Sequence, residues 1–339
     1  MKRHLVLSAT LAAMMAVMSS SAAMAQKASF LDSIEFHGYG QAGFSYDDQS
    51  NRHTNGFNLK RTLLWAKAHI TDRWSFQFMH DFNSVVQEYY TDYRFSNDKS
   101  FSVRLGQFKH SFSMENPMSP TQLELIDVYS QAVLYLAGEG PDPLFGVNYG
   151  RDLGMMFYGD LFNNHLHYEL AVMNGEGVNC KDKNEDKDFI ARLEVRPVEH
   201  LRFVVSGQKG KGHARDTVVW NPSVKKGDDY RRDRVSVGAE YKTDVVSLRG
   251  EYLAGKDGEV KSQGAYLTGR VTVAPNFDLI GSVDYYDFNT SNHRKQTNYT
   301  AGVQYWFYKK CRVQLQYTCC QRGFADNYNW LQGQLQVAF

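Results

Sequence analysis

The chain has 339 residues, with 38 basic against 37 acidic side chains, a formal net charge of +1 and a mean hydropathy of −0.49. This balance excludes bulk charge as a signal for nucleic-acid binding. Although 14% of the residues are aromatic, no apolar run of about 18 residues follows the N-terminal segment, which excludes membrane-spanning helices there.

The first 25 residues are predicted to be a cleaved signal peptide. Lys2 and Arg3 give the segment a cationic start, and an uncharged, mostly apolar run from Leu5 to Met18 follows. Ala23-Met24-Ala25 fits the small-x-small cleavage pattern, so Gln26 is expected to begin the mature chain. The apolar run is too short for a spanning helix, and no cysteine follows the cleavage site to carry a lipid anchor. Cleavage leaves 36 basic and 37 acidic residues, a net charge of −1.

Beyond this segment the sequence alternates with period two, which is typical of strands with one apolar and one polar face. In the last segment, Leu331, Gly333, Leu335, Val337 and Phe339 alternate with Gln332, Gln334 and Gln336. Sixteen strands are predicted: 34–46, 56–70, 74–82, 87–95, 101–109, 152–161, 165–173, 188–196, 201–209, 232–242, 245–254, 260–273, 277–288, 297–308, 311–321 and 328–339. A polar, aromatic-rich chain of such strands predicts an all-β fold, a transmembrane antiparallel barrel with an apolar outside and a wet lumen.

Short and long connections alternate between these strands. The long ones are predicted at 47–55, 83–86, 110–150, 174–187, 210–231, 255–259, 289–296 and 322–327. Outer-membrane barrels have short periplasmic turns and longer external loops. The alternation therefore predicts one barrel domain over residues 26–339, with both ends on the periplasmic side of a Gram-negative outer membrane.

The connection 110–150 is too long for an ordinary loop. Ser119 is placed as a helix N-cap, with Pro120 in the first turn and Gln122 three residues after the cap. The following apolar residues recur at helical spacing and end before a plausible stop at Gly138: Leu125, Val128, Tyr129, Ala132, Val133 and Leu136. A short helix is therefore predicted in this loop. It either folds inward as a constriction loop that narrows the bore or lies across the outer mouth.

The stretch from Arg104 to Lys109, Arg-Leu-Gly-Gln-Phe-Lys, resembles the family of phosphate-selective porins O and P. Phe112-Ser113-Met114-Glu115-Asn116 and Ser119-Pro120 extend the resemblance, and Lys60-Arg61 agrees with it. It implies a sixteen-stranded, trimeric outer-membrane channel for the diffusion of small anions. Phe339 at the carboxyl end resembles the signal by which barrel-assembly machinery recognises outer-membrane proteins.

Seven arginines are expected to face the lumen, and Lys109 ends the family motif beside them. The arginines are Arg104, Arg192, Arg196, Arg202, Arg234, Arg249 and Arg270. Acids are interleaved with them at Glu194, Glu240, Glu251 and Asp284, and Arg249 and Glu251 share one face of one strand. If the charges pair, they brace the wall; if arginines remain unpaired, they form an anion path.

The long loop adds acids at Glu115, Glu124, Asp127, Glu139 and Asp142. Acids on the loop that face arginines on the wall would set up a transverse field across the bore, where the local field decides selectivity. We therefore expect passive diffusion of small hydrophilic solutes that favours anions, with phosphate specificity ranked below general permeability. No cofactor is expected.

Competing functions have weaker signals. The sequence contains no Gly-x-Ser-x-Gly, His-Glu-x-x-His, Cys-x-x-Cys or Gly-Lys-Ser/Thr motif, which disfavours an enzyme or a metal centre. A calcium site is a minor alternative at four acids of one loop: Asp182, Glu185, Asp186 and Asp188. A non-conducting structural or adhesive barrel remains open, since the basic 210–231 loop could bind an anionic partner or the phosphates of lipopolysaccharide.

The four cysteines are Cys180, Cys311, Cys319 and Cys320. Neighbouring residues on a strand point to opposite faces, so Cys319 and Cys320 cannot both serve one partner. Free thiols are the expected state, with a Cys180–Cys320 bridge as the alternative that an oxidising exterior would permit.

Overall fold

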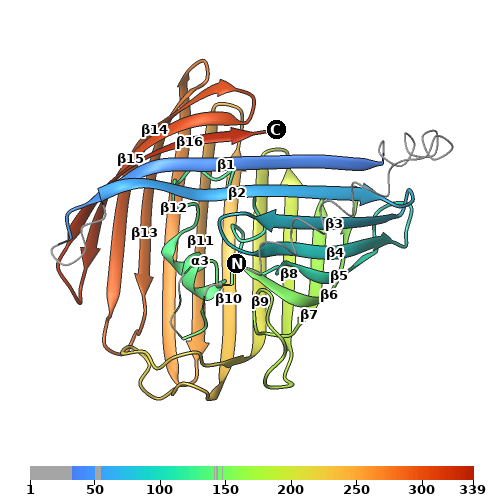
Figure 1. Ribbon diagram of the computed structural model, residues 1–339, viewed down its shortest axis with the longest axis horizontal. Helices are drawn as coiled ribbons and strands as arrows, with labels where there is room; N and C mark the ends of the chain where they lie inside the picture. The colour runs from blue at the N-terminus through green and yellow to red at the C-terminus, as the bar shows by residue number, and fades with distance from the viewer. Residues whose placement is uncertain (1–32, 50–54, 141, 143, 147) are drawn as a thin grey trace, which may run out of the picture.

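The computed structural model describes residues 33–49, 55–140, 142, 144–146 and 148–339. The predicted signal peptide and its cleavage site lie outside these residues. Sixteen antiparallel strands close into one barrel (Figure 1). They are β1 (Ile34–Asp47), β2 (Asn55–His69), β3 (Trp74–Asp81), β4 (Val86–Arg94), β5 (Ser102–Lys109), β6 (Arg151–Leu161), β7 (Leu166–Met173), β8 (Asp188–Val198), β9 (Leu201–His213), β10 (Asp229–Lys242), β11 (Val246–Asp257), β12 (Val260–Ala274), β13 (Phe277–Asp287), β14 (Lys295–Tyr308), β15 (Cys311–Arg322) and β16 (Tyr328–Ala338).

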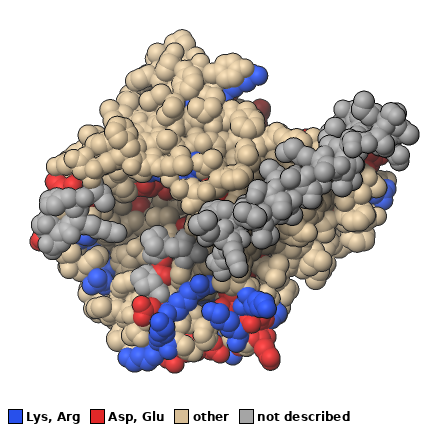
Figure 2. All heavy atoms as spheres, in the orientation of Figure 1, with Lys and Arg blue, Asp and Glu red and all other residues tan. Residues whose placement is uncertain are grey.

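The ring closes where β1 pairs with β16, in a register that runs from Tyr39 opposite Ala338 to Asp47 opposite Trp330. Closure leaves no unpaired strand edge, as a sheet in lipid requires. The predicted alternation is confirmed on β16, where Leu335 is 45% exposed on the outer face and Gln336 is fully buried on the inner one. In Figure 2 charged side chains are sparse over the upper part of the molecule, where β14–β16 lie, and gather near strand ends.

The predicted strand boundaries agree with the observed ones to within four residues. The largest difference is at β9 and β10, which run further out and leave a loop of 214–228 in place of the predicted 210–231. Opposite charges face each other across this extension, with Lys209 opposite Asp233 and His213 opposite Asp229. Such cross-strand pairs stabilise a sheet beyond its apolar part, and apolar periodicity does not reveal them.

Two connections that were predicted to be long are tight turns. Residues 82–85 close a hairpin in which Ser84 N donates to the Asp81 carbonyl at 3.0 Å. The predicted loop 255–259 shrinks to residues 258–259, because Gly258 adopts a positive φ of 60° that suits a two-residue hairpin. The alternation of short and long connections therefore holds only in part.

Within the described residues the single helix is α3 (Gln131–Leu136), which lies inside the ring of strands in Figure 1. The predicted short helix in the inward-folded loop is confirmed, but its predicted start at Ser119 is wrong. The N-cap is Ser130, whose hydroxyl accepts from Val133 N. No helix of the described residues is long and apolar enough to span a membrane.

Candidate functional site

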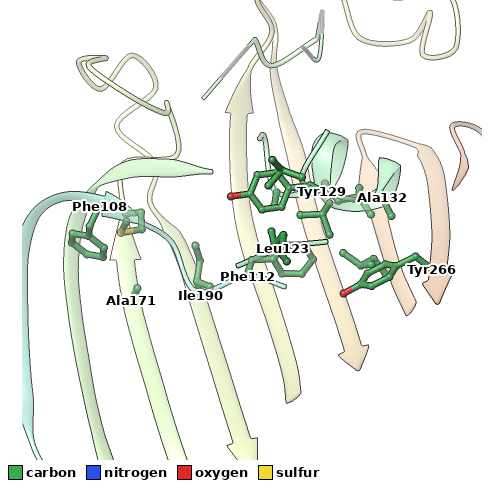
Figure 3. Packing of buried hydrophobic residues seen from close by; sticks show 14 of the residues in the cluster. Phe108, Phe112, Leu123, Tyr129, Ala132, Ala171, Ile190 and Tyr266 are labelled. Atoms are coloured by element: carbon green, nitrogen blue, oxygen red, sulfur yellow. The ribbon is translucent and has the colours of Figure 1, made fainter. Parts of the chain in front are cut away.

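Residues 110–150, which we call the inward loop, pack against one side of the barrel interior. The helix α3 contacts β11, β12 and β13. Phe112, Leu123 and Ala132 of the loop belong to a buried cluster that includes Leu253 and Tyr266 of the wall. Figure 3 shows Phe112, Leu123, Tyr129 and Ala132 grouped beside Tyr266. Burial of this apolar surface holds the loop in the lumen.

Arg249 on β11 is the centre of a buried ion cluster that ties the loop to the wall. Its guanidinium is 3.1 Å from Glu115, 2.6 Å from Glu124 and 3.1 Å from Glu240, and the first two acids belong to the loop. No side chain in the cluster is more than 6% exposed. Two of the loop acids that were predicted to face wall arginines are therefore in direct contact with one of them, Arg249.

The wall also holds the loop through its backbone. Arg312 Nη2 donates to the Leu123 carbonyl at 2.8 Å, and Gln316 Nε2 donates to the Glu124 carbonyl at 2.7 Å. Gln316 accepts in turn from Ile126 N at 2.8 Å. Because wall side chains bind the carbonyls and amides that a helix from Ser119 would use, this part of the loop forms turns instead.

Lys109 closes the two ends of the loop onto each other. Its ammonium lies 2.9 Å from Glu139 and 2.7 Å from the Asn116 carbonyl, and it donates to the Tyr129 hydroxyl at 2.5 Å. Burial opposes ionisation of Glu139, but Lys109 and Arg151 outweigh it and lower the pKa of that carboxyl. Lys109 therefore fastens the loop.

The other predicted lumen arginines all have a carboxylate partner. The shortest contacts are Arg104–Asp92 at 2.9 Å, Arg192–Glu194 at 2.7 Å, Arg196–Glu194 at 2.8 Å, Arg202–Glu240 at 2.7 Å, Arg234–Asp257 at 2.8 Å and Arg270–Asp278 at 3.2 Å. The structure therefore has the paired arrangement, in which these arginines brace the wall. A ladder of unpaired arginines at these positions is absent.

Two cations that the predicted set does not contain, Lys60 and Arg61 on β2, lie beside the loop. Lys60 Nζ is 2.9 Å from Asp127 of the loop, and the two side chains are 17% and 35% exposed. Arg61 donates to the Gln41 amide oxygen at 3.1 Å, and no ion pair joins it to a carboxylate in the described part of the chain. Strict alternation would point one of the two side chains to lipid.

A β-bulge explains this departure. The pairing of β1 with β2 shifts between Gln41 and Ala42, so that Arg61 faces Gln41, Leu59 faces Ala42 and Lys60 is the additional residue. A bulge breaks the inside–outside alternation at that point. The only sequence signal that both side chains matter was the adjacent Lys60-Arg61 pair, which agrees with the porin family.

Two loop acids have raised pKa values. Burial raises the pKa of Glu115 to about 7, although Arg249 and the Ser130 N–H act in the opposite direction. Burial, reinforced by Asp257, raises the pKa of Asp142 to about 7. Docking of the loop therefore depends on the protonation of groups that titrate near neutral pH.

The alternative sites are not supported by the contacts. Lys187 pairs with Asp182, Lys211 lies 2.9 Å from Asp186 and Arg232 pairs with Asp188, so cations neutralise three of the four acids of the suggested calcium site. Among the described residues no group of three or more His, Cys, Asp or Glu side chains could hold a metal ion. All four cysteines are free, and Cys180 Sγ instead accepts from Arg215 at 3.0 Å. The free-thiol expectation is confirmed.

Similar architectures occur among solved structures. An anion-selective porin from Comamonas acidovorans has a TM-score of 0.65 at 13% identity, covering 91% of this chain and 99% of that one. The trimer form of OmpT from Vibrio cholerae has a TM-score of 0.63 at 12% identity, covering 90% and 99%. OmpF of Salmonella typhi, solved with daunomycin, has a TM-score of 0.64 at 11% identity, covering 90% and 97%. At these identities the likeness shows the fold alone, a sixteen-stranded porin barrel.

The sequence profile described as "phosphate-selective porin O and P" matches residues 37–339. No curated protein sequence matches the chain. The chain belongs to the family of phosphate-selective porins O and P. It is a porin of the Gram-negative outer membrane, with the family and fold of a channel rather than of an enzyme.

Proposed function

We propose that this porin passes small hydrophilic solutes with a preference for anions, and that Arg61, beside the Lys60–Asp127 pair, is the contact that favours them. The observation that carries the proposal is the contrast between Arg61 and the seven arginines that were predicted to face the lumen. The seven predicted arginines are neutralised by carboxylates. Arg61 has only a neutral amide as its hydrogen-bond partner in the described residues.

The surroundings of Arg61 support its place beside the passage. Arg61 and Arg151 both act on the Tyr129 hydroxyl of the loop, where they partly offset the burial that raises the pKa of Tyr129 well above its ordinary value. Arg61 therefore lies on the β1–β2 wall close to the loop, next to the contact of Lys60 with Asp127. A guanidinium without a carboxylate partner at the wall of a lumen lowers the barrier for an anion.

The test is the reversal potential of the refolded protein in a planar bilayer with a tenfold KCl gradient. We expect an anion-side potential, with the anion-to-cation permeability ratio falling about twofold or more in Arg61→Gln. Arg231→Gln, near the start of β10, is the matched control, since it removes an equal charge from a side chain that is 60% exposed. Arg104→Ala tests the predicted motif arginine, and we expect a smaller effect because Asp92 already neutralises it. A channel without anion preference, or no current at all, would overturn the proposal, and the latter would favour the adhesive barrel.

The assembly is part of the same proposal. We propose a homotrimer whose first mature residue is Gln26, whose Phe339 is recognised by barrel-assembly machinery and whose external surface contacts lipopolysaccharide. The trimer form of OmpT, a barrel of the same fold, supports the oligomeric state. The mass of the unheated protein in detergent, measured by light scattering, tests the trimer, and N-terminal sequencing tests the cleavage site.

A further inference from the structure

The end of the barrel that carries the short turns contains a cavity of about 500 Å³. Ser119, Thr121 and Gln122 of the inward loop line one part of it, and the beginning of β1 and the turn after β14 line another. Small-molecule sites commonly measure about 300–1,000 Å³. This vestibule is therefore large enough for an organic molecule rather than only for a simple ion.

Three lysines give the vestibule a surplus of positive charge. Lys242, Lys309 and Lys310 line it, and no ion pair joins any of them to a carboxylate in the described part of the chain. The two acidic side chains of the lining are already occupied, since Glu124 pairs with Arg249 and Asp278 with Arg270. A carboxylate at Phe339 offsets only one of the three lysines. An anion is thus attracted to this end of the lumen.

Aromatic rings give the vestibule an apolar wall. Trp65 lies with its ring centre 5.3 Å from that of His37 and 6.2 Å from that of Tyr39, and all three line the cavity. Trp306 on β14 also lines it, and its indole N–H donates to Asp278 at 3.0 Å, which fixes the ring. Arg312 lies over the Trp306 ring, 5.0 Å from its centre, so a ligand ring would stack on the opposite face of Trp306 or on Trp65.

We propose that the vestibule is a binding site for aromatic dianions, which stack on Trp306 or Trp65 while their charged groups meet Lys309 and Lys310. An inorganic anion would leave most of the cavity and its rings unfilled. A neutral aromatic molecule would leave the lysines without a counter-charge. Binding at this place needs no conduction, so the site is independent of the anion preference proposed above.

The experiment measures binding of 2,6-naphthalenedicarboxylate to the refolded protein in detergent, by equilibrium dialysis at low ionic strength. We expect Lys309→Gln combined with Lys310→Gln to raise the Kd about tenfold. The matched control combines Lys225→Gln with Lys226→Gln, an equally exposed lysine pair on the 214–228 loop, and should leave the Kd unchanged. Trp306→Leu should also weaken the naphthalene compound but not adipate, an aliphatic dianion.

A second measurement locates the site in the membrane. The dicarboxylate should block the single-channel current at lower concentration from the side that exposes the short turns than from the other side. Equal binding of adipate and the naphthalene compound would overturn the aromatic part of the proposal. Loss of affinity in the 214–228 control, or equal block from both sides, would overturn its location. If the dialysis succeeds and no current is seen, only the channel proposal fails.

Discussion

Replacing Arg249 by Gln is expected to release the inward loop from the barrel wall. The substitution removes the single cation shared by Glu115, Glu124 and Glu240, and leaves three carboxylates that are buried to more than 90%. Glu240 keeps its contact with Arg202 at 2.7 Å, but Glu115 and Glu124 lose their cation. Removing one partner from a buried ion cluster costs about 3–5 kcal/mol, because charges are left out of water without compensation. That cost lowers the equilibrium constant for loop docking about a hundredfold to several-thousandfold.

The cost exceeds the contribution of the apolar side chain next to the ion cluster. Leu123 lies in the segment that Arg249 fixes, and fully burying such a side chain contributes about 1.5–3 kcal/mol. We expect the released loop to move within the lumen, so single-channel recordings of Arg249→Gln should show larger and noisier currents. The loop should also become open to a protease added to protein reconstituted in liposomes.

The matched control is Arg231→Gln, because Arg231 pairs with Asp233 near the start of β10 and its side chain is 60% exposed. Exposed pairs contribute only about 0–1 kcal/mol, so its currents and protease resistance should be those of the unmodified protein. Arg249→Lys keeps the charge but loses the guanidinium that contacts three carboxylates at once. Its current noise and protease sensitivity should lie between those of Arg249→Gln and the unmodified protein. If Arg249→Gln conducts as quietly as the unmodified protein and resists protease equally, the ion cluster does not hold the loop.

Three further predictions follow from the same geometry. Because Glu115 and Asp142 have pKa values raised to about 7 by burial, the docked loop binds protons more tightly than an exposed loop, so docking should strengthen as pH falls from 8 to 5 and weaken as it rises through 7. Current noise should fall accordingly, and Glu115→Gln should remove much of this dependence; noise that instead rises on acidification would contradict it. Gly150→Ala should lower thermal stability by about 1–3 kcal/mol, because φ is +61° and a Cβ there would overlap Asn116, whereas Gly40→Ala has open space and should be nearly neutral in the same melting assay. With all four cysteines free, a reducing agent should leave the melting temperature unchanged and four thiols should react after unfolding, and a smaller thiol count would reveal a bridge.

The strands were predictable because their signal is local. A lumen-facing glutamine and a lipid-facing leucine alternate within a few residues, as Gln336 and Leu335 do, and no distant partner is needed to recognise them. The helix start was not predictable for the opposite reason. Ser119 and Pro120 form a valid cap signal, but Gln316, almost two hundred residues away, binds the carbonyl and amide that the helix would need.

The partners of lumen charges depend on register and on the loop, which sequence spacing does not give. Arg249 and Glu251 share one face and would be matched with each other from the sequence. In the structure Arg249 binds Glu115 and Glu124, and Glu251 accepts from Ser113 Oγ at 2.9 Å and Met114 N at 2.8 Å. Both side chains therefore bind the loop and not each other.

The charges that hold the barrel differ from those that meet a solute in how far carboxylates compensate them. An arginine with two or three buried carboxylates, such as Arg249, has its charge compensated at short range, and only a weak field remains for a passing ion. Arg61 keeps its field because a bulge turns it toward the lumen, where its partner is an amide. If selectivity followed the number of lumen arginines, Arg104→Ala and Arg61→Gln would change the reversal potential equally. If it follows uncompensated charge, as we argue, only Arg61→Gln changes it strongly.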